Sequence, residues 1–437
     1  MSGRRIAVVG AGVAGLVAAR ELHGAGYEVS VFEVGDYAGG HTNTVSVEGD
    51  AGAWEVDTGF IVLNDRNYPN FERLLAELRV DTQPANMSFS VSDGRGGFEW
   101  ASRPRGVFAQ GSNLLDPRFH RMLLDLVRFF RDARSLVGTN GKGPTLRAFL
   151  EQRGYSDYFV ERLIVPQISA IWSADPDQLW AFPASFMAEF LDNHGNLQLL
   201  GRPRWRTIPG GARRYVEAMT TPFRDRIHLR TPVRAIRRRP DGVELVLTFG
   251  VERFDEVVIA THSDQALALL ADPTDAEREV LGAITYQPNE AVLHTDERLL
   301  PRRRGAWASW NFHLTPEPAG RTTVTYHMNR LQSLVADREF LVTLNRSEAI
   351  DPARVIRRIP YAHPAYTAGG VAAQDRWDEI SGANRTHYCG AYWRWGFHED
   401  GVWSALRVGA ALGASPPPSD GRATDALAPA SGAGEAE

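Results

Sequence analysis

The sequence has little cysteine and almost no lysine, because Cys389 and Lys142 are the single residues of each kind among 437. One cysteine cannot form a disulfide within the chain, which predicts a reducing compartment, the cytoplasm. No run of about 18 apolar residues occurs, so we expect no membrane-spanning helix, and any membrane contact would be peripheral, at the inner face. An apolar strand pattern starts within the first residues, so no signal peptide is expected.

An excess of positive charge is also missing. The formal net charge is −5 and the pI is about 6.2, which argues against a nucleic-acid partner. Arginine clusters at 237–239 and 302–304 are interpreted as solvated surface, with a membrane-facing role for the second as the alternative. No metal site is predicted. Residues 414–437 carry almost no large apolar side chain, so we predict a disordered tail.

A strand, a glycine-rich loop, a helix, a second strand and an acid follow one another at the start of the chain. Residues 5–9 and 28–32 are short apolar runs, and residues 16–23 have helical spacing. This order is typical of a dinucleotide-binding unit, whose helix N-terminus receives phosphates and whose acid binds a ribose hydroxyl. A structural unit without a nucleotide is the alternative. The predicted cofactor-binding residues here are Gly10, Gly12, Val13, Ala14, Gly15 and Glu33.

A second glycine pair, Gly39 and Gly40, follows the ribose acid and is itself followed by His41. Thr58 and Gly59 then form a further turn. A nicotinamide site needs no such extension. A flavin does, because its ribityl chain and ring system run past the pyrophosphate. We therefore predict noncovalent FAD, with these five residues among its contacts.

These motifs resemble the FAD-binding start of the flavin amine oxidase, phytoene desaturase and protoporphyrinogen oxidase superfamily, which usually has arginine where this chain has His41. The run from Gly39 to Thr44 is similar to one branch, the predicted NAD/FAD-binding oxidoreductases associated with cyclopropane-fatty-acid synthases. The resemblance extends to about Gly413. It implies an α/β fold of the GR2 flavoprotein type, with a Rossmann-like FAD-binding domain and an α+β substrate domain that combines a mixed sheet with a helical block.

The resemblance implies further cofactor contacts near the middle and the end of the chain. The Val233 backbone would pair with the adenine ring, although the residues alone support a plain edge strand nearly as well. Gly390, Gly401 and Val402 match the motif in which a helix N-terminus points at the flavin pyrimidine edge. We expect that helix to begin at Trp403, with N–H groups near Val402 stabilising the negative charge of the reduced flavin.

The pattern divides the chain into two interleaved domains. Apolar alternation predicts a floor sheet from residues 286–294, 306–312 and 322–328, whereas the proline-containing residues 360–364 are predicted to form a loop. The basic, amphipathic helix predicted at 114–137 is interpreted as a core helix, with a lid near a lipid as the alternative. The predicted FAD-binding domain comprises residues 1–85, 205–270 and 376–413, and the predicted substrate domain comprises residues 86–204 and 271–375.

We predict an FAD-dependent oxidoreductase acting on an apolar substrate, an unsaturated or methyl-branched fatty-acyl chain of a lipid, by desaturation, saturation or double-bond isomerisation. The aromatic-rich substrate segments suit such a chain, and the branch resemblance implies a functional pairing with a fatty-acyl methyltransferase. Many amine oxidases of the superfamily hold a water near flavin N5 with a lysine. Lys142 lies in a glycine-rich loop instead, which weakens amine oxidation.

Three alternatives stay open. Amine oxidation and polyene desaturation belong to the same class as the main prediction. The third alternative belongs to another functional class: a non-catalytic lipid-binding module similar to the GDP dissociation inhibitors. No catalytic acid or base stands out: His398 and Glu399 beside the C-terminal flavin motif, and His313 and Tyr326 on the floor sheet, are candidates, and each has a structural role as its simpler interpretation.

Overall fold

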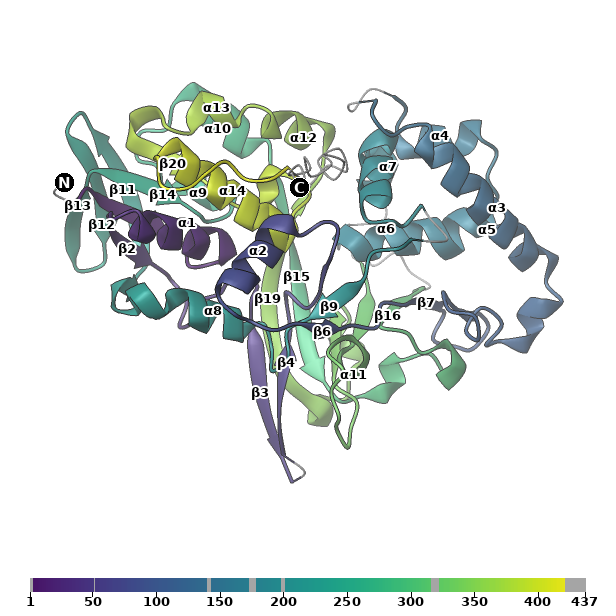
Figure 1. Cartoon of the computed structure of the whole chain (residues 1–437). Coiled ribbons are helices and arrows are strands. Elements are labelled where there is room, and N and C mark those ends of the chain that lie inside the picture. Colours follow the sequence, from purple (N-terminus) through teal and green to yellow (C-terminus); the bar gives the residue numbers. More distant parts are fainter. Residues whose placement is uncertain are drawn as a thin grey trace, which may run out of the picture.

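The computed structural model describes residues 3–50, 52–139, 143–172, 178–197, 201–315 and 322–420. Lys142 and the predicted tail beyond residue 420 lie outside this part of the chain. Figure 1 shows two lobes, one containing α1 (Val13–Gly24) and α14 (His398–Ala411) and the other containing α3 (Pro117–Arg134). The long strands β15 (Thr285–His294) and β19 (Val355–Ala365) lie between them.

The first domain is built on a five-stranded parallel sheet of order β10-β2-β1-β14-β20. The first two predicted strands are confirmed as β1 and β2, and β1 pairs on its other side with β14, far along the chain. Buried aliphatic residues of the strands and of α1 and α14 form one core. The strands are β1 (Arg5–Val9), β2 (Glu28–Phe32), β10 (Ile227–His228), β14 (Glu256–Ile259) and β20 (Thr386–Tyr388).

Helices and small sheets complete this domain. A three-stranded antiparallel sheet contains β11 (Val233–Arg239), β12 (Gly242–Leu247) and β13 (Gly250–Phe254). The hairpin of β3 (Thr44–Gly49) and β4 (Gly52–Asp57) projects away from the lobe, and β5 (Leu63–Asn64), β9 (Trp205–Thr207) and β6 (Gln83–Pro84) form another small sheet. The remaining helices are α2 (Pro69–Glu77), α8 (Arg213–Thr220), α9 (Ser263–Leu269), α10 (Asp275–Gly282), α12 (Ala368–Gln374) and α13 (Trp377–Ile380).

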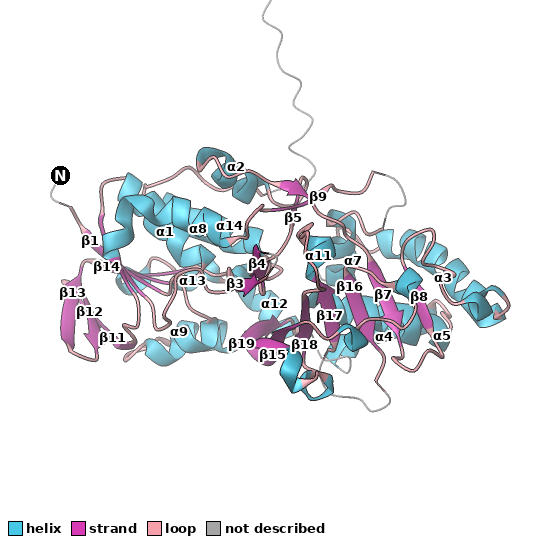
Figure 2. Cartoon of the chain, turned by 90° about the horizontal axis from the view of Figure 1, so that it is seen from below, coloured by secondary structure: helices cyan, strands magenta, loops and turns pink. Residues whose placement is uncertain are grey.

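The second domain has a seven-stranded mixed sheet with helices packed on one face, as Figure 2 shows. The sheet order is β19-β15-β18-β17-β16-β7-β8, and only β7 and β16 pair in parallel. Its further strands are β7 (Phe89–Ser92), β8 (Glu99–Ala101), β16 (Trp310–His313), β17 (Val324–His327) and β18 (Leu341–Leu344). The helices are α3, α4 (Leu146–Gln152), α5 (Asp157–Phe159), α6 (Val165–Trp172), α7 (Ala184–Asn193) and α11 (Met328–Leu331). Within the described ranges no helix is long and apolar enough to cross a bilayer.

Two sequence expectations about this architecture are wrong. Residues 360–364 are not a loop but part of β19, which tolerates Pro360 and Pro364 because it is an edge strand with one unpaired side. Helices α10 and α12 were assigned to the substrate domain, yet Val280, Leu281 and Ala373 are buried in the core of the first domain. Most of the apolar contacts of these two helices are thus made with the first domain, although Val371 of α12 packs against the second core. We place the domain boundary within β15 and β19.

Residues 414–420 are not a disordered tail. The side chain of Asn70, at the start of α2, donates to the Ser419 carbonyl oxygen at 2.8 Å and accepts from the Ser419 N–H at 3.0 Å. Trp403 Nε1 donates to Asp420 Oδ1 at 3.1 Å. Composition missed this segment because its contacts are polar and partly made by the backbone, and they require no large apolar side chain.

Truncation after Ala414 should therefore lower the free energy of unfolding by about 1–3 kcal/mol, since an intramolecular hydrogen bond contributes on the order of 1 kcal/mol. Truncation after Asp420 should leave the melting temperature unchanged, and Asn70→Ala in the full chain should cost at least as much as the first truncation, because it also removes the hydrogen bond from Asn70 Nδ2 to Glu399. Thermal unfolding of the three variants measures this. Equal melting temperatures for the two truncations would show that the segment contributes nothing.

Candidate cofactor and active site

Three glycines shape the turn from β1 to α1. Gly10 has φ of +104°, and a Cβ there would lie 2.9 Å from the Ala260 carbonyl oxygen. A Cβ on Gly15 would lie 1.9 Å from the Gly10 carbonyl oxygen, so the helix packs directly on the loop. Gly12 is the N-cap of α1 and has no heavy atom within 4 Å of its Cβ position. Open space therefore faces the start of α1 at Val13 and Ala14, where free N–H groups and the helix dipole favour an anion.

The carboxylate of Glu33 is tied to this loop. Its two oxygens accept hydrogen bonds from the Ala11 N–H and the Gly35 N–H, both at 2.7 Å. A carboxylate has about four acceptor positions, so capacity remains for ribose hydroxyls. The Thr231 N–H donates to the Glu33 carbonyl oxygen at 2.8 Å, which brings the start of β11 at Val233 close to the acid.

The second glycine pair lies against the first loop. The Gly39 N–H donates to the Ala11 carbonyl oxygen at 2.7 Å, and a Cβ on Gly40 would lie 3.1 Å from Gly12 Cα. A Cβ on Gly59 would lie 2.2 Å from the His41 carbonyl oxygen. The structure thus brings the glycine loop, Gly39 to His41 and the turn at Thr58 and Gly59 together as one layer of closely spaced backbone.

The C-terminal helix α14 begins at His398, not at Trp403. Gly401 therefore lies in its first turn, where a Cβ would lie 2.7 Å from Val13 Cγ1, so this glycine permits close packing of α14 on α1. The expectation that N–H groups near Val402 end the helix is wrong, because the helix end lies four residues earlier. Gly390 precedes this element, and its N–H donates to Ser404 Oγ at 2.9 Å.

His398 is buried and firmly held. Its ring stacks on Phe60 with centroids 3.8 Å apart, and its Nε2 lies 2.6 Å from the Tyr215 hydroxyl and 3.3 Å from Thr42 Oγ1. Burial lowers the pKa of His398 to about 3, so the ring is neutral at physiological pH. The stacked ring and the two hydroxyl groups hold His398 in place between α14 and the segment of Thr42.

Glu399 closes the N-terminus of α2. Its carboxyl group accepts from Asn70 Nδ2 at 2.6 Å and from the backbone N–H groups of Asn70 at 3.2 Å and Phe71 at 2.9 Å. Burial raises the pKa of Glu399 to about 8, against the opposing effect of these donors. The side chain is thus committed to joining α14 with α2.

The other two catalytic candidates, His313 and Tyr326, lie on opposite faces of the seven-stranded sheet. Trp310 pairs with Tyr326 and Asn311 with Thr325, and neighbouring residues on a strand point to opposite faces. His313 Nε2 lies 2.8 Å from Thr325 Oγ1 on the polar face, and burial lowers its pKa to about 3. Tyr326 is half-buried on the apolar face, with its ring centroid 5.0 Å from that of Trp310. One substrate cannot meet both side chains.

Comparison with known proteins identifies the family. The family model described as flavin containing amine oxidoreductase matches residues 13–339, well over half of the chain. The chain belongs to the flavin-containing amine oxidoreductase family. Among curated relatives, a Mycobacterium tuberculosis protein named as a flavin-containing monoamine oxidase, AofH, is 27% identical over 288 residues, which cover 61% of this chain and 59% of the relative. A carotenoid phi-ring synthase from Streptomyces griseus is 28% identical over 321 residues, which cover 68% of this chain and 59% of the relative.

Solved structures share the fold of this flavin amine oxidoreductase over nearly its whole length. Cyclohexylamine oxidase from Brevibacterium oxydans superposes with a TM-score of 0.67 at 17% identity, over 94% of this chain and 98% of that structure. The CLA-producing fatty acid isomerase from P. acnes gives 0.68 at 15% identity, with the same coverage. These values show the fold alone. Because the curated matches span only about 59% of each relative, they leave the substrate to be proposed.

FAD is the cofactor of this oxidoreductase family, and the residues of this chain fit it. The site offers open space beside Gly12, a helix N-terminus without a side-chain cap, and an acid with free acceptor capacity. His41 adds a buried Nε2 that has no hydrogen-bond partner in the described structure. The protein is therefore an enzyme, and the non-catalytic binding-module alternative is set aside. The thiol of Cys389 is buried in the core, where burial raises its pKa. Noncovalent attachment of FAD stays a prediction.

Several residues of the site escaped sequence reasoning. Tyr215 and Thr42 hold His398, while Tyr361, His262 and His363 lie around His41. Thr42 lies within the run from Gly39 to Thr44, which the sequence analysis did single out, whereas no motif pointed to Tyr215. His262 and His363 come from distant segments, and no spacing rule relates them to His41. Within the described ranges no group of three or more His, Cys, Asp or Glu side chains forms a metal site.

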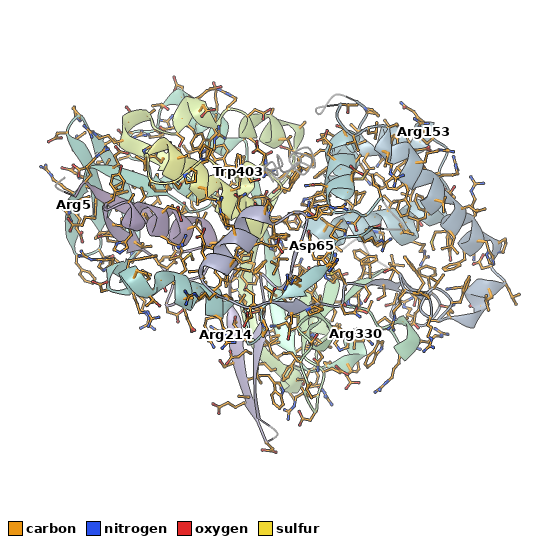
Figure 3. All side chains as sticks on the ribbon, in the orientation of Figure 1. Arg5, Asp65, Arg153, Arg214, Arg330 and Trp403 are labelled. Carbon is orange, nitrogen blue, oxygen red and sulfur yellow. The ribbon has the colours of Figure 1, made fainter. Side chains whose placement is uncertain are left out.

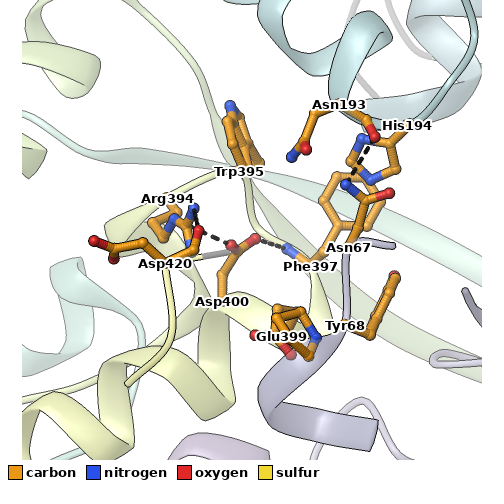
Figure 4. Close-up of a pocket in the computed structure, with 11 residues that line it drawn as sticks. Asn67, Tyr68, Asn193, His194, Arg394, Trp395, Phe397, Glu399, Asp400 and Asp420 are labelled. Carbon is orange, nitrogen blue, oxygen red and sulfur yellow. Dashed lines mark hydrogen bonds and ion pairs between the residues drawn. The ribbon is translucent and has the colours of Figure 1, made fainter. Parts of the chain in front are cut away.

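A small polar recess opens beside α14, between the two lobes (Figure 4). Asn67, His194, Arg394, Phe397 and Asp400 are among its lining residues. The Asp400 carboxylate accepts from the Phe397 N–H at 2.8 Å and lies 3.7 Å from Arg394 Nε. Burial raises the pKa of Asp400 to about 6. Asp400 thus caps α14, as Glu399 caps α2.

Gly12→Val should yield a folded protein without FAD. The position has ordinary φ of −74° and free space for a side chain, but that space is where the pyrophosphate must approach. Gly15→Ala should instead destabilise the fold, because its Cβ would overlap the Gly10 carbonyl. Flavin absorbance and thermal unfolding of the two purified variants measure both effects. Near-normal FAD content in folded Gly12→Val would contradict the assignment.

Proposed function

We propose that this FAD-dependent oxidoreductase acts on an apolar substrate, an unsaturated or methyl-branched fatty-acyl chain of a lipid, and desaturates it, saturates it or moves its double bond. Bound FAD supplies the hydride acceptor or donor at N5. The residues of the chain bind and orient the acyl chain and exclude water. One observation carries the proposal: the apolar face of the seven-stranded sheet, which faces the helical block, holds large aromatic side chains that are only half-buried.

The two faces of that sheet differ in polarity. On one face Ser90, Asn311, Thr325 and Thr343 are fully buried, and they satisfy one another through bonds of 2.7–2.8 Å. On the other face Phe89, Trp310 and Tyr326 pack against the second core but stay half-buried. An acyl chain laid along such a face gains about 0.8 kcal/mol per buried CH₂. Of the four catalytic candidates, Tyr326 alone lies on this face.

Aromatic rings also connect the helical block to the flavin motif. Trp172 of α6 lies 4.6 Å from Phe190 of α7, and Phe190 stacks on Phe397, the N-cap of α14, at 5.2 Å. Tyr366, after β19, stacks on Phe186 at 5.5 Å. This aromatic cluster suits an apolar chain beside the cofactor. It suits an amine as well, because ring faces attract cations. Amine oxidation is therefore the second candidate, and polyene desaturation the third.

Lipid substrates imply two partners. We propose that the enzyme works in sequence with a fatty-acyl methyltransferase. The methyltransferase would produce the methyl-branched chain or use the unsaturated chain as its own substrate. Contact with the inner face of a membrane would give access to lipid. Leu115, Leu124 and Val127 on and before α3 are 89%, 64% and 57% exposed, and Arg121 and Arg131 flank them. Figure 3 shows Arg153, which neighbours α3, at the outer edge of this lobe.

Leu115→Glu with Leu124→Glu should abolish binding to vesicles of mixed phosphatidylglycerol and phosphatidylcholine, because each change places a charge where an apolar side chain would insert. Val251→Glu is the matched control, since Val251 is 52% exposed on the first domain. Co-sedimentation at low and high salt measures the binding. Equal binding by the double variant and the control would contradict the membrane contact.

The substrate is tested by mixing the oxidised holoenzyme anaerobically with unsaturated and methyl-branched phospholipids and with a panel of amines. The dithionite-reduced enzyme is mixed with the same lipids. Flavin absorbance reports net redox steps, and mass analysis of the lipids reports shifted double bonds. We expect a lipid response and none to amines. Oxidation of amines without any lipid change would favour amine oxidase activity instead.

Trp310→Ala should raise the half-saturating lipid concentration about tenfold, because part of a large apolar contact is lost. FAD content should stay unchanged. Phe249→Ala is the control, since Phe249 is 97% exposed on the first domain. An unchanged half-saturating concentration in Trp310→Ala would show that the apolar sheet face does not bind the substrate.

A further inference from the structure

Three histidines from distant segments meet at the carboxyl edge of the five-stranded sheet. His41 follows the second glycine pair, His262 follows the end of β14, and His363 lies on β19. The ring centroid of His41 is 5.4 Å from that of His363 and 6.4 Å from that of His262. A Cβ on Gly40 would lie 3.1 Å from the Cα of Gly12, the N-cap of α1, so the backbone that leads into His41 lies against the start of that helix.

The hydrogen bonds of the cluster fix the protonation of His363 but not that of His41. His363 Nδ1 accepts from Asn289 Nδ2 at 2.8 Å, and Asn289 Oδ1 accepts from Asn345 Nδ2 at 2.6 Å, which fixes the orientation of the Asn289 amide. His363 is therefore neutral, and its proton is on Nε2, a donor. His41 Nε2 has no partner in the described structure and is out of contact with solvent. No protein hydrogen bond at Nε2 fixes the tautomer or the charge of His41, so this ring can change its protonation state when a ligand binds.

The surroundings of His41 keep it neutral when no anion is bound. Burial and the neighbouring His363, His262 and His398 lower the pKa of His41 well below its ordinary value. Burial likewise lowers the pKa of His262, and the charge of Asp264 on α9 opposes this effect. The other ionisable groups that face the cluster are tyrosines: Tyr361 stacks on His41 at 4.7 Å, and Tyr286 stacks on His262 at 4.3 Å. Tyr37 is the third tyrosine near the cluster. Burial, with Tyr361 and Glu33, raises its pKa to about 12, and Arg357 opposes this effect.

FAD brings two negative charges to this edge of the sheet. A helix N-terminus contributes about half an elementary charge, and a half-buried diphosphate needs more compensation than that. We propose that His41 takes up a proton when FAD binds, and that its imidazolium, with His363 as a neutral donor and His262 beside it, neutralises the diphosphate. Stacking on Tyr361 further favours the cationic ring. The proposal concerns cofactor binding, so it stands or falls independently of the lipid substrate.

The sign of the pH dependence follows from linkage. Binding raises the pKa of His41 from well below 6.5, so the complex holds a proton that the free protein lacks between the two pKa values. FAD affinity should therefore fall as pH rises across that window, by at most about tenfold per pH unit. Titration calorimetry of FAD into the apoprotein, in two buffers of different ionisation enthalpy, measures affinity and proton uptake together. We expect close to one proton per FAD near pH 7.

Matched variants locate the proton. His41→Arg should bind FAD with near wild-type affinity but with no uptake and a flat pH profile, because its charge is permanent. His363→Gln should weaken binding several-fold while keeping the uptake. His120→Gln, on the exposed surface of α3, should behave as wild type. Thermal unfolding of each apoprotein checks the fold. The absence of uptake in the wild type, or its persistence in His41→Arg, would overturn the proposal.

Discussion

Direct contact between stretches of backbone is the constraint on which this structure depends. The Gly10 carbonyl oxygen lies so close to Gly15 that no side chain fits between them, and the Gly39 N–H donates to the Ala11 carbonyl oxygen. The absence of side chains lets α1, the second glycine pair and the end of β14 approach one point. The cofactor space, the hold on Glu33 and the position of His41 all follow from that approach.

Local order along the chain was predictable, whereas meetings between distant segments were not. The strand, loop, helix, strand and acid at the start were predicted because each lies within the reach of a spacing rule. His262 and His363 were missed because only tertiary packing brings them to His41. Gly401 was expected just before a helix that begins at Trp403, although it lies within α14, where Val13 needs the room. Pro360 and Pro364 looked like a loop because the sequence does not reveal that β19 is an edge strand.

Burial and sheet geometry distinguish the catalytic candidates from one another. Period-two alternation identified the floor sheet, but it could not say which face would pack against the helical block. The structure places His313 in a satisfied polar network and leaves Tyr326 among half-buried aromatic rings. Glu399 and Asp400 had the right position beside the flavin motif, yet each one caps a helix. Their chemistry joins elements together, which a sequence motif alone cannot distinguish from catalysis.

The discontinuity of the first domain has a consequence for how the protein is made. Strand β1 pairs with β14, α1 packs on α14, and Asn70 is hydrogen-bonded to Ser419. During synthesis the edge of β1 therefore stays unpaired until β14 has been made, and the contacts of α1 with α14 form later still. Contacts of such long sequence separation form slowly and expose strand edges meanwhile. The helices between residues 117 and 193 contact one another within a short stretch of chain and can form early, so the cofactor domain is the part whose closure waits for the most distant segments.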